Sequence, residues 1–350
     1  MKFQQTLAGR RVLVTGHTGF KGSWLSLWLR TLEADVQGIS LAPETQPNMF
    51  DLCGLEGMVE HRVQDIRNRH ALKGVIRDFD PEYVFHMAAQ PLVRRSYETP
   101  LETFETNTMG TAYLLDALRG CSMLKGVIAI TTDKVYENKE RQAPYGEEDH
   151  LGGKDPYSAS KSAAEMVIGG YRGLLQAPLA AARGGNVIGG GDWSEDRLIP
   201  DLVRALGKGE ALTLRNPEAT RPWQHVLCLC HGYLRLAVEM ERNPEHAAQA
   251  WNFGPSEADT VSVAKVLERF GDQWTLPRID VKPEGAKPES QILKLTSAKA
   301  EDRLGWRPAW ALDKAVEATA EWYRKAQEGA DMHKVSVEQI KAYIRDMEAG

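Results

Sequence analysis

Two residues four positions apart, Tyr157 and Lys161, could together carry out acid–base chemistry. At this spacing, two side chains lie on one face of a helix. A lysine ammonium beside a tyrosine favours the phenolate and lowers a pKa that is normally about 10. We therefore expect Tyr157 to accept a proton from a substrate hydroxyl near neutral pH. The spacing alone is weak support, because it also arises by chance.

A second set of reactive side chains, Thr132, Asp133 and Lys134, lies upstream in the same segment. It follows the apolar run 126–131, which we expect to be a buried strand. In open α/β sheets, ligands bind at the carboxyl ends of the strands. One segment, residues 131–161, therefore carries two candidate acid–base sets.

A nucleotide-binding fold must surround this segment, and the amino-terminal residues have the pattern of one. Residues 11–15 (RVLVT) are expected to form a buried strand, and residues 20–32 carry apolar side chains at helical spacing. Glycines between them allow a tight turn and a close approach to a pyrophosphate at the helix N-terminus. A plain glycine-rich turn is the alternative, and the flanking strand and helix disfavour it. The spacing of this loop is GxxGxxG, and its cofactor-binding candidates are Gly16, Thr18, Gly19, Phe20, Lys21 and Gly22.

The second expected strand, residues 36–40, does not decide which dinucleotide the loop would bind. A dinucleotide fold often has Asp or Glu at its end, which binds the adenosine ribose and separates NAD from NADP. This chain has Ser40 and Leu41 there, and Lys21 in the glycine loop could meet a phosphate. The residues themselves leave the choice of cofactor open.

The next two expected strands bring further candidates. Residues 58–64 end at Asp65 and Ile66, where the carboxylate could accept a hydrogen bond from an adenine amino group or could cap the following helix. Residues 83–87 end at residues beside which a flat cofactor could lie, namely Ala88, Ala89 and Gln90.

Two arginines and an asparagine follow these strands. Arg94 or Arg95 could meet a phosphate, or both could be exposed charges. Asn107 lies near the start of a helix expected at 104–119. It is a further candidate for the cofactor site.

The alternation of strands and helices predicts the fold class. With a helix at 156–171 and a strand at 179–183, at least five βα units fill residues 11–183. The economical fold is α/β, with a Rossmann-like doubly wound parallel sheet and a smaller α+β domain after it. Beyond residue 183 the rhythm breaks in a glycine-rich loop, GGNVIGGGDW, which contains Asn186 and can wrap a ligand or serve as a linker.

The segment after this loop is rich in groups that bind nucleotides. Arg215, Arg221 and Gln224 lie close together in the chain, with a tryptophan between the last two. Arginine forks suit a diphosphate, and an aromatic or amide group suits a nucleobase. Helices are expected at 226–240, 261–270, 311–327 and 334–348.

Composition narrows the function classes. The chain has 350 residues, a net charge of −5 and no basic stripe interleaved with aromatic residues, which argues against nucleic acid as the main partner. The first residues lack the apolar core of a signal peptide, and no apolar run reaches membrane-spanning length. We expect a cytoplasmic protein without a membrane partner.

Cysteine use agrees with a reducing compartment, because the chain has only four cysteines. Four potential metal ligands do cluster in the sequence, at His225, Cys228, Cys230 and His231. On the helix expected after residue 226, residues two apart face different directions, and no second ligand pair exists elsewhere. We therefore expect no metal site.

Taken together, the motifs resemble the extended short-chain dehydrogenase/reductase family (NAD-dependent epimerase/dehydratase), and within it the nucleotide-sugar 4,6-dehydratases that act on CDP-glucose. GxxGxxG and YxxxK are common to the superfamily, whereas GHTGFKGSWL, TTDK, GNVIGGGDW and RPWQHV are specific to the subgroup. The matching strings span about residues 10–323. The resemblance implies NAD as cofactor, CDP-glucose as substrate, and a place in the synthesis of deoxysugars for a surface polysaccharide.

The resemblance also implies roles for the two reactive sets. Tyr157, aided by Lys161 and Thr132, would take the proton of the carbon 4 hydroxyl while NAD takes the hydride. Asp133 would protonate the hydroxyl that leaves carbon 6. Lys134 stands where related enzymes for other nucleotides have a glutamate base for carbon 5, and it would act either as a neutral base or as a cation that stabilises the enolate.

Substrate contacts and organisation are implied in the same way. The substrate-binding candidates are Arg94, Asn186, Arg215, Arg221 and Gln224. Residues 1–185, with a segment near 225–258 that returns to them, would form the NAD-binding domain. Residues 186–224 and 259–350 would bind the nucleotide sugar. A homodimer would form through helices near 100–119 and 156–171.

Two other functions are weighed against this one. An epimerase or decarboxylase of the same fold would share Tyr157 and Lys161 but would not need the aspartate at position 133. A non-catalytic NAD-sensing protein would be expected to lose Tyr157 or Lys161, and both are present. A 4,6-dehydratase acting on another nucleotide sugar is the remaining alternative.

Overall fold

The computed structural model describes residues 2–282 and 291–349. Its centre is a parallel sheet of seven strands in the order β10-β6-β5-β4-β1-β2-β3. The chain builds β1, β2 and β3 outward in one direction and then returns to place β4, β5 and β6 on the other side of β1. This reversal creates the switch point at whose carboxyl edge α/β proteins bind ligands. The strands are β1 (Arg11–Thr15), β2 (Asp35–Ser40), β3 (Glu60–Val63), β4 (Tyr83–His86), β5 (Gly126–Ile130), β6 (Leu179–Gly184) and β10 (Ala250–Phe253).

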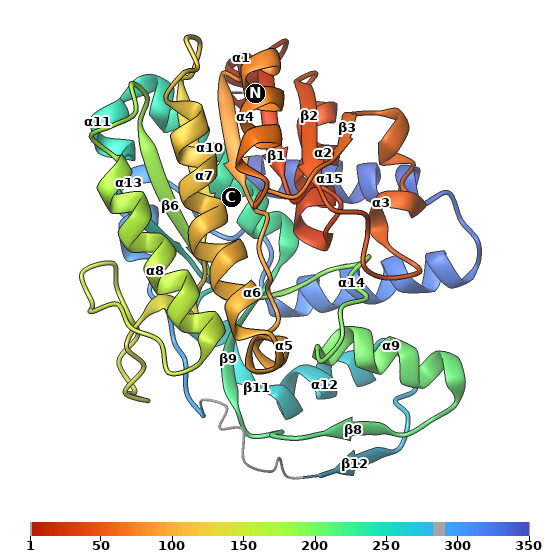
Figure 1. Ribbon diagram of the computed structural model, residues 1–350. Helices are drawn as coiled ribbons and strands as arrows, with labels where there is room; N and C mark the ends of the chain where they lie inside the picture. Colours follow the sequence, from red (N-terminus) through yellow and green to blue (C-terminus); the bar gives the residue numbers. More distant parts are fainter. Residues whose placement is uncertain (1, 283–290, 350) are drawn as a thin grey trace.

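Helices cover both faces of this sheet (Figure 1). Along β1, Val12 and Val14 face one hydrophobic cluster while Leu13 faces the other, as the two-residue period of a strand requires. Apolar residues are therefore needed at every position of the central strands. One face is covered by α4 (Arg69–Phe79), α7 (Gly110–Leu118) and α8 (Pro156–Tyr171), and the other by α2 (Phe20–Thr31) and α10 (Val226–Arg242), with α1 (Lys2–Leu7) and α15 (Met332–Ala349) packed outside them.

A smaller layer lies beyond the carboxyl ends of the sheet, at the lower end of the molecule in Figure 1. It contains a three-stranded sheet in the order β11-β9-β7 and a two-stranded sheet of β12 and β8. The strands are β7 (Asn186–Ile188), β8 (Leu212–Leu214), β9 (Thr220–His225), β11 (Thr260–Ser262) and β12 (Ile279–Val281), and the helices are α9 (Leu198–Lys208), α12 (Val263–Gly271) and α14 (Leu312–Gln327).

The remaining elements are short. They are α3 (Met49–Leu52), α5 (Val93–Glu98), α6 (Pro100–Phe104), α11 (Pro244–Ala247), α13 (Ala298–Leu304), the 3-10 turns η1 (Leu55–Gly57), η3 (Asp133–Val135) and η4 (Glu257–Asp259), and the π turn η2 (Glu105–Met109). Among the residues described, no helix is both long and apolar enough to cross a membrane.

The α/β fold class is confirmed, and two local predictions were wrong. The helix expected at 104–119 is interrupted by the π turn η2, which places Asn107 in its middle. The helix expected from residue 261 begins at Val263, because residues 260–262 pair with β9 and Ser262 caps α12 by accepting from the Lys265 N–H. The segment 225–258 supplies α10 and β10 to the main layer, and the division into two domains stays a prediction.

Candidate active site

A cavity of about 870 Å³ opens at the carboxyl edge of the seven-stranded sheet. The ends of β1, β4, β5 and β6 line one side of it, and the smaller layer lines the other. Three of the predicted site residues, Asn107, Lys161 and Gln224, lie behind its wall. All the others line it.

The glycine loop between β1 and α2 is closely packed. Gly16 has a φ of +76°, and a Cβ there would come within 2.7 Å of the Ala88 backbone nitrogen. A Cβ at Gly22 would lie 2.1 Å from the Gly16 carbonyl oxygen. Gly19 is the N-cap residue of α2 and has no side chain to accept from the first N–H groups. The loop is therefore shaped to present helix N–H groups to an anion.

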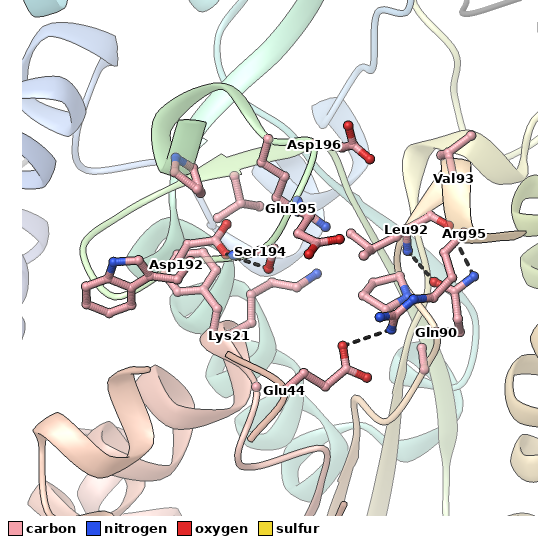
Figure 2. A pocket seen from close by; sticks show the side chains of 18 of the residues that line it. Lys21, Glu44, Gln90, Leu92, Val93, Arg95, Asp192, Ser194, Glu195 and Asp196 are labelled. Carbon is pink, nitrogen blue, oxygen red and sulfur yellow. Dashed lines mark hydrogen bonds and ion pairs between the residues drawn. The ribbon is translucent and has the colours of Figure 1, made fainter. Parts of the chain in front are cut away.

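The loop is also fixed to the end of β2. The Thr18 hydroxyl donates to the Leu41 carbonyl oxygen at 2.9 Å and lies 2.8 Å from the Ser40 hydroxyl. Glu44 and Arg95 form an ion pair of 3.0 Å at the edge of the cavity (Figure 2). Lys21 projects into the cavity, where burial and the nearby charge of Arg197 lower its pKa to about 8.

Asp65 lines the cavity and does not cap a helix. Its carboxylate accepts from the Arg67 backbone and guanidinium at 2.7 to 3.1 Å, and the hydrogen bond from Arg67 holds its pKa below the usual range. The N-cap residue of α4 is Asn68, which accepts from the Ala71 N–H. The capping alternative for Asp65 was therefore wrong.

Asn107 lies behind the wall of the cavity and binds the backbone of a wall residue, Gln90. Its side chain accepts from the Gln90 N–H at 2.8 Å and donates to the Gln90 carbonyl oxygen at 3.1 Å. It also donates to the Ser160 hydroxyl on α8 at 2.9 Å. Asn107 thus fixes the backbone after β4 relative to the helix that carries Tyr157.

The predicted trio lies directly after β5. Thr132 caps the turn η3 by accepting from the Lys134 N–H at 3.3 Å, and its hydroxyl donates to Asp133 Oδ1 at 3.0 Å. Asp133 is 2% exposed, and among the described residues its Oδ2 has no hydrogen-bond partner. Burial raises the pKa of Asp133, against the opposing charge of Lys134. A buried carboxyl of this kind is suited to donate a proton.

Tyr157 and Lys161 lie on the first turns of α8, which Asp155 caps and Pro156 begins. The Lys161 ammonium donates to the Ile130 carbonyl oxygen at 3.1 Å. Burial, together with the charge of Lys21, lowers the pKa of Lys161 to about 7.

The phenol of Tyr157 differs from the expectation. Burial raises its pKa to about 12, and a hydrogen bond with Thr132 and the charge of Arg197 only partly oppose this. The predicted lowering by Lys161 was wrong for this structure, because the lysine is bonded to the end of β5 and is itself readily neutral.

A buried ion pair behind the trio was missed by the sequence reasoning. Arg183 on β6 donates two bonds to Glu165 on α8, at 2.9 and 3.0 Å, and both side chains are under 5% exposed. Glu165 also accepts from the Thr131 hydroxyl at 2.6 Å. The signal was an arginine within a buried strand, because a buried charge needs a partner.

The predicted substrate arginines are distributed around the other side of the cavity. Arg94 and Arg215 both donate to Asp196 Oδ1, at 3.1 and 2.6 Å. Arg221 is buried and donates to the Thr220 and Gln291 carbonyl oxygens. Asp196 belongs to a loop of residues 192–197, and the sequence reasoning gave Asp196 no role. Figure 2 shows the labelled side chains of this loop following one another along the cavity above Lys21.

Gln224 contributes to the fold of this region and does not reach the cavity. Its amide donates to the Phe253 carbonyl oxygen at 2.7 Å, which ties β9 to β10. Asn186, at the start of β7, lines the cavity.

Comparison with known proteins agrees with this geometry. Residues 13–319 match the family described as GDP-mannose 4,6 dehydratase. The CDP-glucose 4,6-dehydratase of Salmonella typhimurium is 42% identical over 351 residues, which cover 96% of each chain.

Two solved structures share the fold. The dTDP-glucose 4,6-dehydratase of Bacillus anthracis, in complex with NAD, superposes with a TM-score of 0.77 at 22% identity and covers 93% of this chain and 99% of its own. The UDP-glucose 4-epimerase of Thermotoga maritima, with UDP-glucose, has a TM-score of 0.77 at 22% identity and covers 91% and 99%. These two structures confirm the doubly wound fold, and the family match and the 42% identical relative confirm the resemblance inferred from the motifs.

Proposed function

The chain belongs to the GDP-mannose 4,6 dehydratase family, within the extended short-chain dehydrogenases/reductases, and from this premise we propose that it is a hydro-lyase that converts CDP-glucose to CDP-4-keto-6-deoxyglucose with NAD. The observation that carries this proposal is the position of Thr132, Asp133, Lys134 and Tyr157 in one cavity with the glycine loop. An epimerase does not need a buried, proton-donating carboxyl beside the Tyr and Thr pair.

The residues of the cavity fit a dinucleotide. The turns after β1 and β4 approach so closely that a Cβ at Gly16 would collide with Ala88. The glycine loop and the small residues Ala88 and Ala89 both line the cavity. When bound, NAD would supply the acceptor for a hydride from carbon 4 and the donor that returns it to carbon 6. The glycine loop would hold its diphosphate, and Asp65 and Ile66 would lie beside its adenosine.

The proton transfers are assigned to different side chains of this protein. Tyr157 takes the proton of the carbon 4 hydroxyl as a phenolate. The hydrogen bond with Thr132 and the charge of Arg197 favour this form and oppose the burial that raises the pKa of Tyr157 to about 12. Asp133 gives its proton to the hydroxyl that leaves carbon 6, for which its raised pKa suits it. Lys134, next to Asp133, removes the carbon 5 proton as a neutral amine, or it stabilises the enolate as a cation while another group or water takes that proton. A proton returns to carbon 5 when the hydride returns to carbon 6.

The arginines of the smaller layer support a nucleotide diphosphate as the other half of the substrate. Arg94, Arg215 and Arg221 all line the cavity, and arginine forks match phosphate oxygens. Cytidine as the base is supported by the 42% identical relative, whose name gives CDP-glucose as its substrate. The synthesis of deoxysugars for a surface polysaccharide, in the cytoplasm, fits that substrate.

A homodimer is part of the proposal. Large apolar side chains are exposed on α6 and η2 (Leu101, Phe104 and Met109) and on α8 (Met166), and Leu101 is 72% exposed. Because α6 and α8 pack against each other, these side chains can meet the same helices of a second copy. Sedimentation of the wild type and of a Leu101→Glu, Met166→Glu variant tests this arrangement.

The function is tested by incubating the protein with NAD and, separately, the CDP-, dTDP-, UDP- and GDP-hexoses, and measuring the mass of the products. Loss of one water with CDP-glucose alone is expected. Loss of water with another nucleotide sugar would change the proposed substrate but leave the proposed reaction unchanged. An isomer of unchanged mass would favour the epimerase and contradict the role of Asp133.

A further inference from the structure

Asp196 lies on the wall of the cavity and pairs with two arginines. Its Oδ1 accepts from Arg94 on α5 at 3.1 Å and from Arg215, which follows β8, at 2.6 Å. All three residues line the cavity. A single carboxylate oxygen therefore brings together two arginines that come from different segments of the chain.

The charges explain why this oxygen is needed. Two guanidinium groups at one point repel each other unless an anion lies between them. Burial raises the pKa of Asp196, but the hydrogen bond and charge of Arg215, with Arg94, outweigh it and hold this pKa below the usual range. The carboxylate is thus an anion that holds the pair together when no ligand is bound.

A phosphate oxygen has the same charge and the same hydrogen-bonding pattern as this carboxylate oxygen. We propose that Asp196 is a positioning residue that acts as an internal substitute for a phosphate oxygen: it holds Arg94 and Arg215 together in the free protein and releases them when the diphosphate of the nucleotide sugar takes its place. This proposal rests on the proposed function, because it assigns the two arginines to the diphosphate.

The first part of the loop that carries Asp196 is anchored by hydrogen bonds, and none of these bonds involves Asp196. Asp192 accepts from the Ser194 N–H and hydroxyl, and Arg204 on α9 donates to the Trp193 and Ser194 carbonyl oxygens. Asp196 itself has a φ of +58°, a conformation that costs energy for most residues but that Asn and Asp tolerate. Asp196→Asn therefore removes the charge and keeps the backbone.

The test measures binding of three probes to the wild-type protein and to Asp196→Asn by calorimetry. The probes are CDP, inorganic pyrophosphate and cytidine. We expect the Kd of CDP and of pyrophosphate to fall about three- to tenfold in the variant, as for the loss of two half-exposed ion pairs that compete with the ligand. The Kd of cytidine should not change, because cytidine has no phosphate.

Two controls distinguish competition between Asp196 and a phosphate from a general effect of removing a negative charge near the cavity. Glu195→Gln removes the same charge from the adjacent residue of the loop, and it should leave the Kd of pyrophosphate nearly unchanged. In an Arg215→Gln background, Asp196→Asn should give a smaller gain, because one of the two competing pairs is already absent. Equal gains for Glu195→Gln and Asp196→Asn, or no gain for Asp196→Asn, would overturn the proposal.

The outcome is distinguishable from failure of the proposed function. Tighter pyrophosphate binding by Asp196→Asn, with no dehydration of any nucleotide sugar by the wild type, would keep the role of Asp196 and reject the activity. Dehydration of CDP-glucose by the wild type, with an unchanged Kd of pyrophosphate in Asp196→Asn, would keep the proposed activity and reject the role of Asp196.

Discussion

The ammonium of Lys161 donates a hydrogen bond to the Ile130 carbonyl oxygen at the end of β5, at 3.1 Å. This bond joins the helix that carries Tyr157 to the strand that delivers Thr132 and Asp133. The two acid–base sets are therefore held in one position relative to each other. Lys161 therefore contributes to the geometry of the site through this bond, in addition to contributing a charge when protonated.

Tyr157→Phe should lower kcat by about a hundred- to ten-thousandfold, because the carbon 4 hydroxyl loses the group that takes its proton. Binding of CDP-glucose should survive, since the ring and its packing remain. Steady-state kinetics and calorimetry on the same preparation measure both quantities. Turnover at the wild-type rate would reject the role of Tyr157.

Asp133→Asn should permit oxidation at carbon 4 but slow elimination, because an amide has no acidic proton to give the leaving hydroxyl. The expected signal is a single-turnover rise in the absorbance of the reduced cofactor without loss of water from the sugar. Asp201→Asn, which removes a carboxyl paired with Arg204 at 2.6 Å, is the comparison. Elimination by Asp133→Asn at the wild-type rate would contradict the assignment.

Asp133 should also make stability depend on pH. Its folded-state pKa lies above the unfolded value, so the folded protein holds a proton that the unfolded chain releases. Its contribution to the free energy of unfolding is therefore complete below an unfolded pKa of about 3.9 and is lost as the pH rises through the folded-state pKa. Asp133→Asn should be more stable than the wild type near neutral pH, and urea unfolding should show this difference shrinking in acid. A difference that is constant across pH would exclude this linkage.

Glu165→Gln should destabilise the protein by about 3–5 kcal/mol, because the buried Arg183 would lose its partner. Urea unfolding measures the loss. The matched control is Glu137→Gln, whose ion pair with Lys139 is half exposed at 3.1 Å and should matter far less. Similar losses for the two variants would show that the Glu165 pair is no more important than a surface pair.

Arg221→Ala should raise the Kd of CDP-glucose about tenfold or more and leave the Kd of NAD nearly unchanged, if Arg221 meets the diphosphate of the sugar nucleotide. Because the side chain is also bonded to the Thr220 and Gln291 carbonyl oxygens, Arg221→Lys should be measured beside it to separate charge from packing. Equal losses for the two ligands would assign Arg221 a structural role.

The features that could be predicted from the sequence are those that depend on residues close together in the chain. The glycine loop, the trio after β5 and the spacing of Tyr157 and Lys161 each depend on residues close together in the chain, and strand and helix periods place them at the edge of a sheet. The doubly wound parallel sheet was expected from the alternation of strands and helices. Residues such as Asp65 and Ser40 could be located in this way, although their hydrogen bonds could not.

Only the tertiary structure decided which groups meet across the cavity. Arg94, Asp196 and Arg215 come from three segments far apart in the chain, and Glu165 meets Arg183 only because α8 packs on β6. The raised pKa values of Asp133 and Tyr157 are likewise consequences of burial. The sequence by itself determined the reactive groups and their supporting elements, because these follow from local backbone preferences. Their partners, burial and charge states were decided by packing, because those depend on contacts that no local pattern encodes.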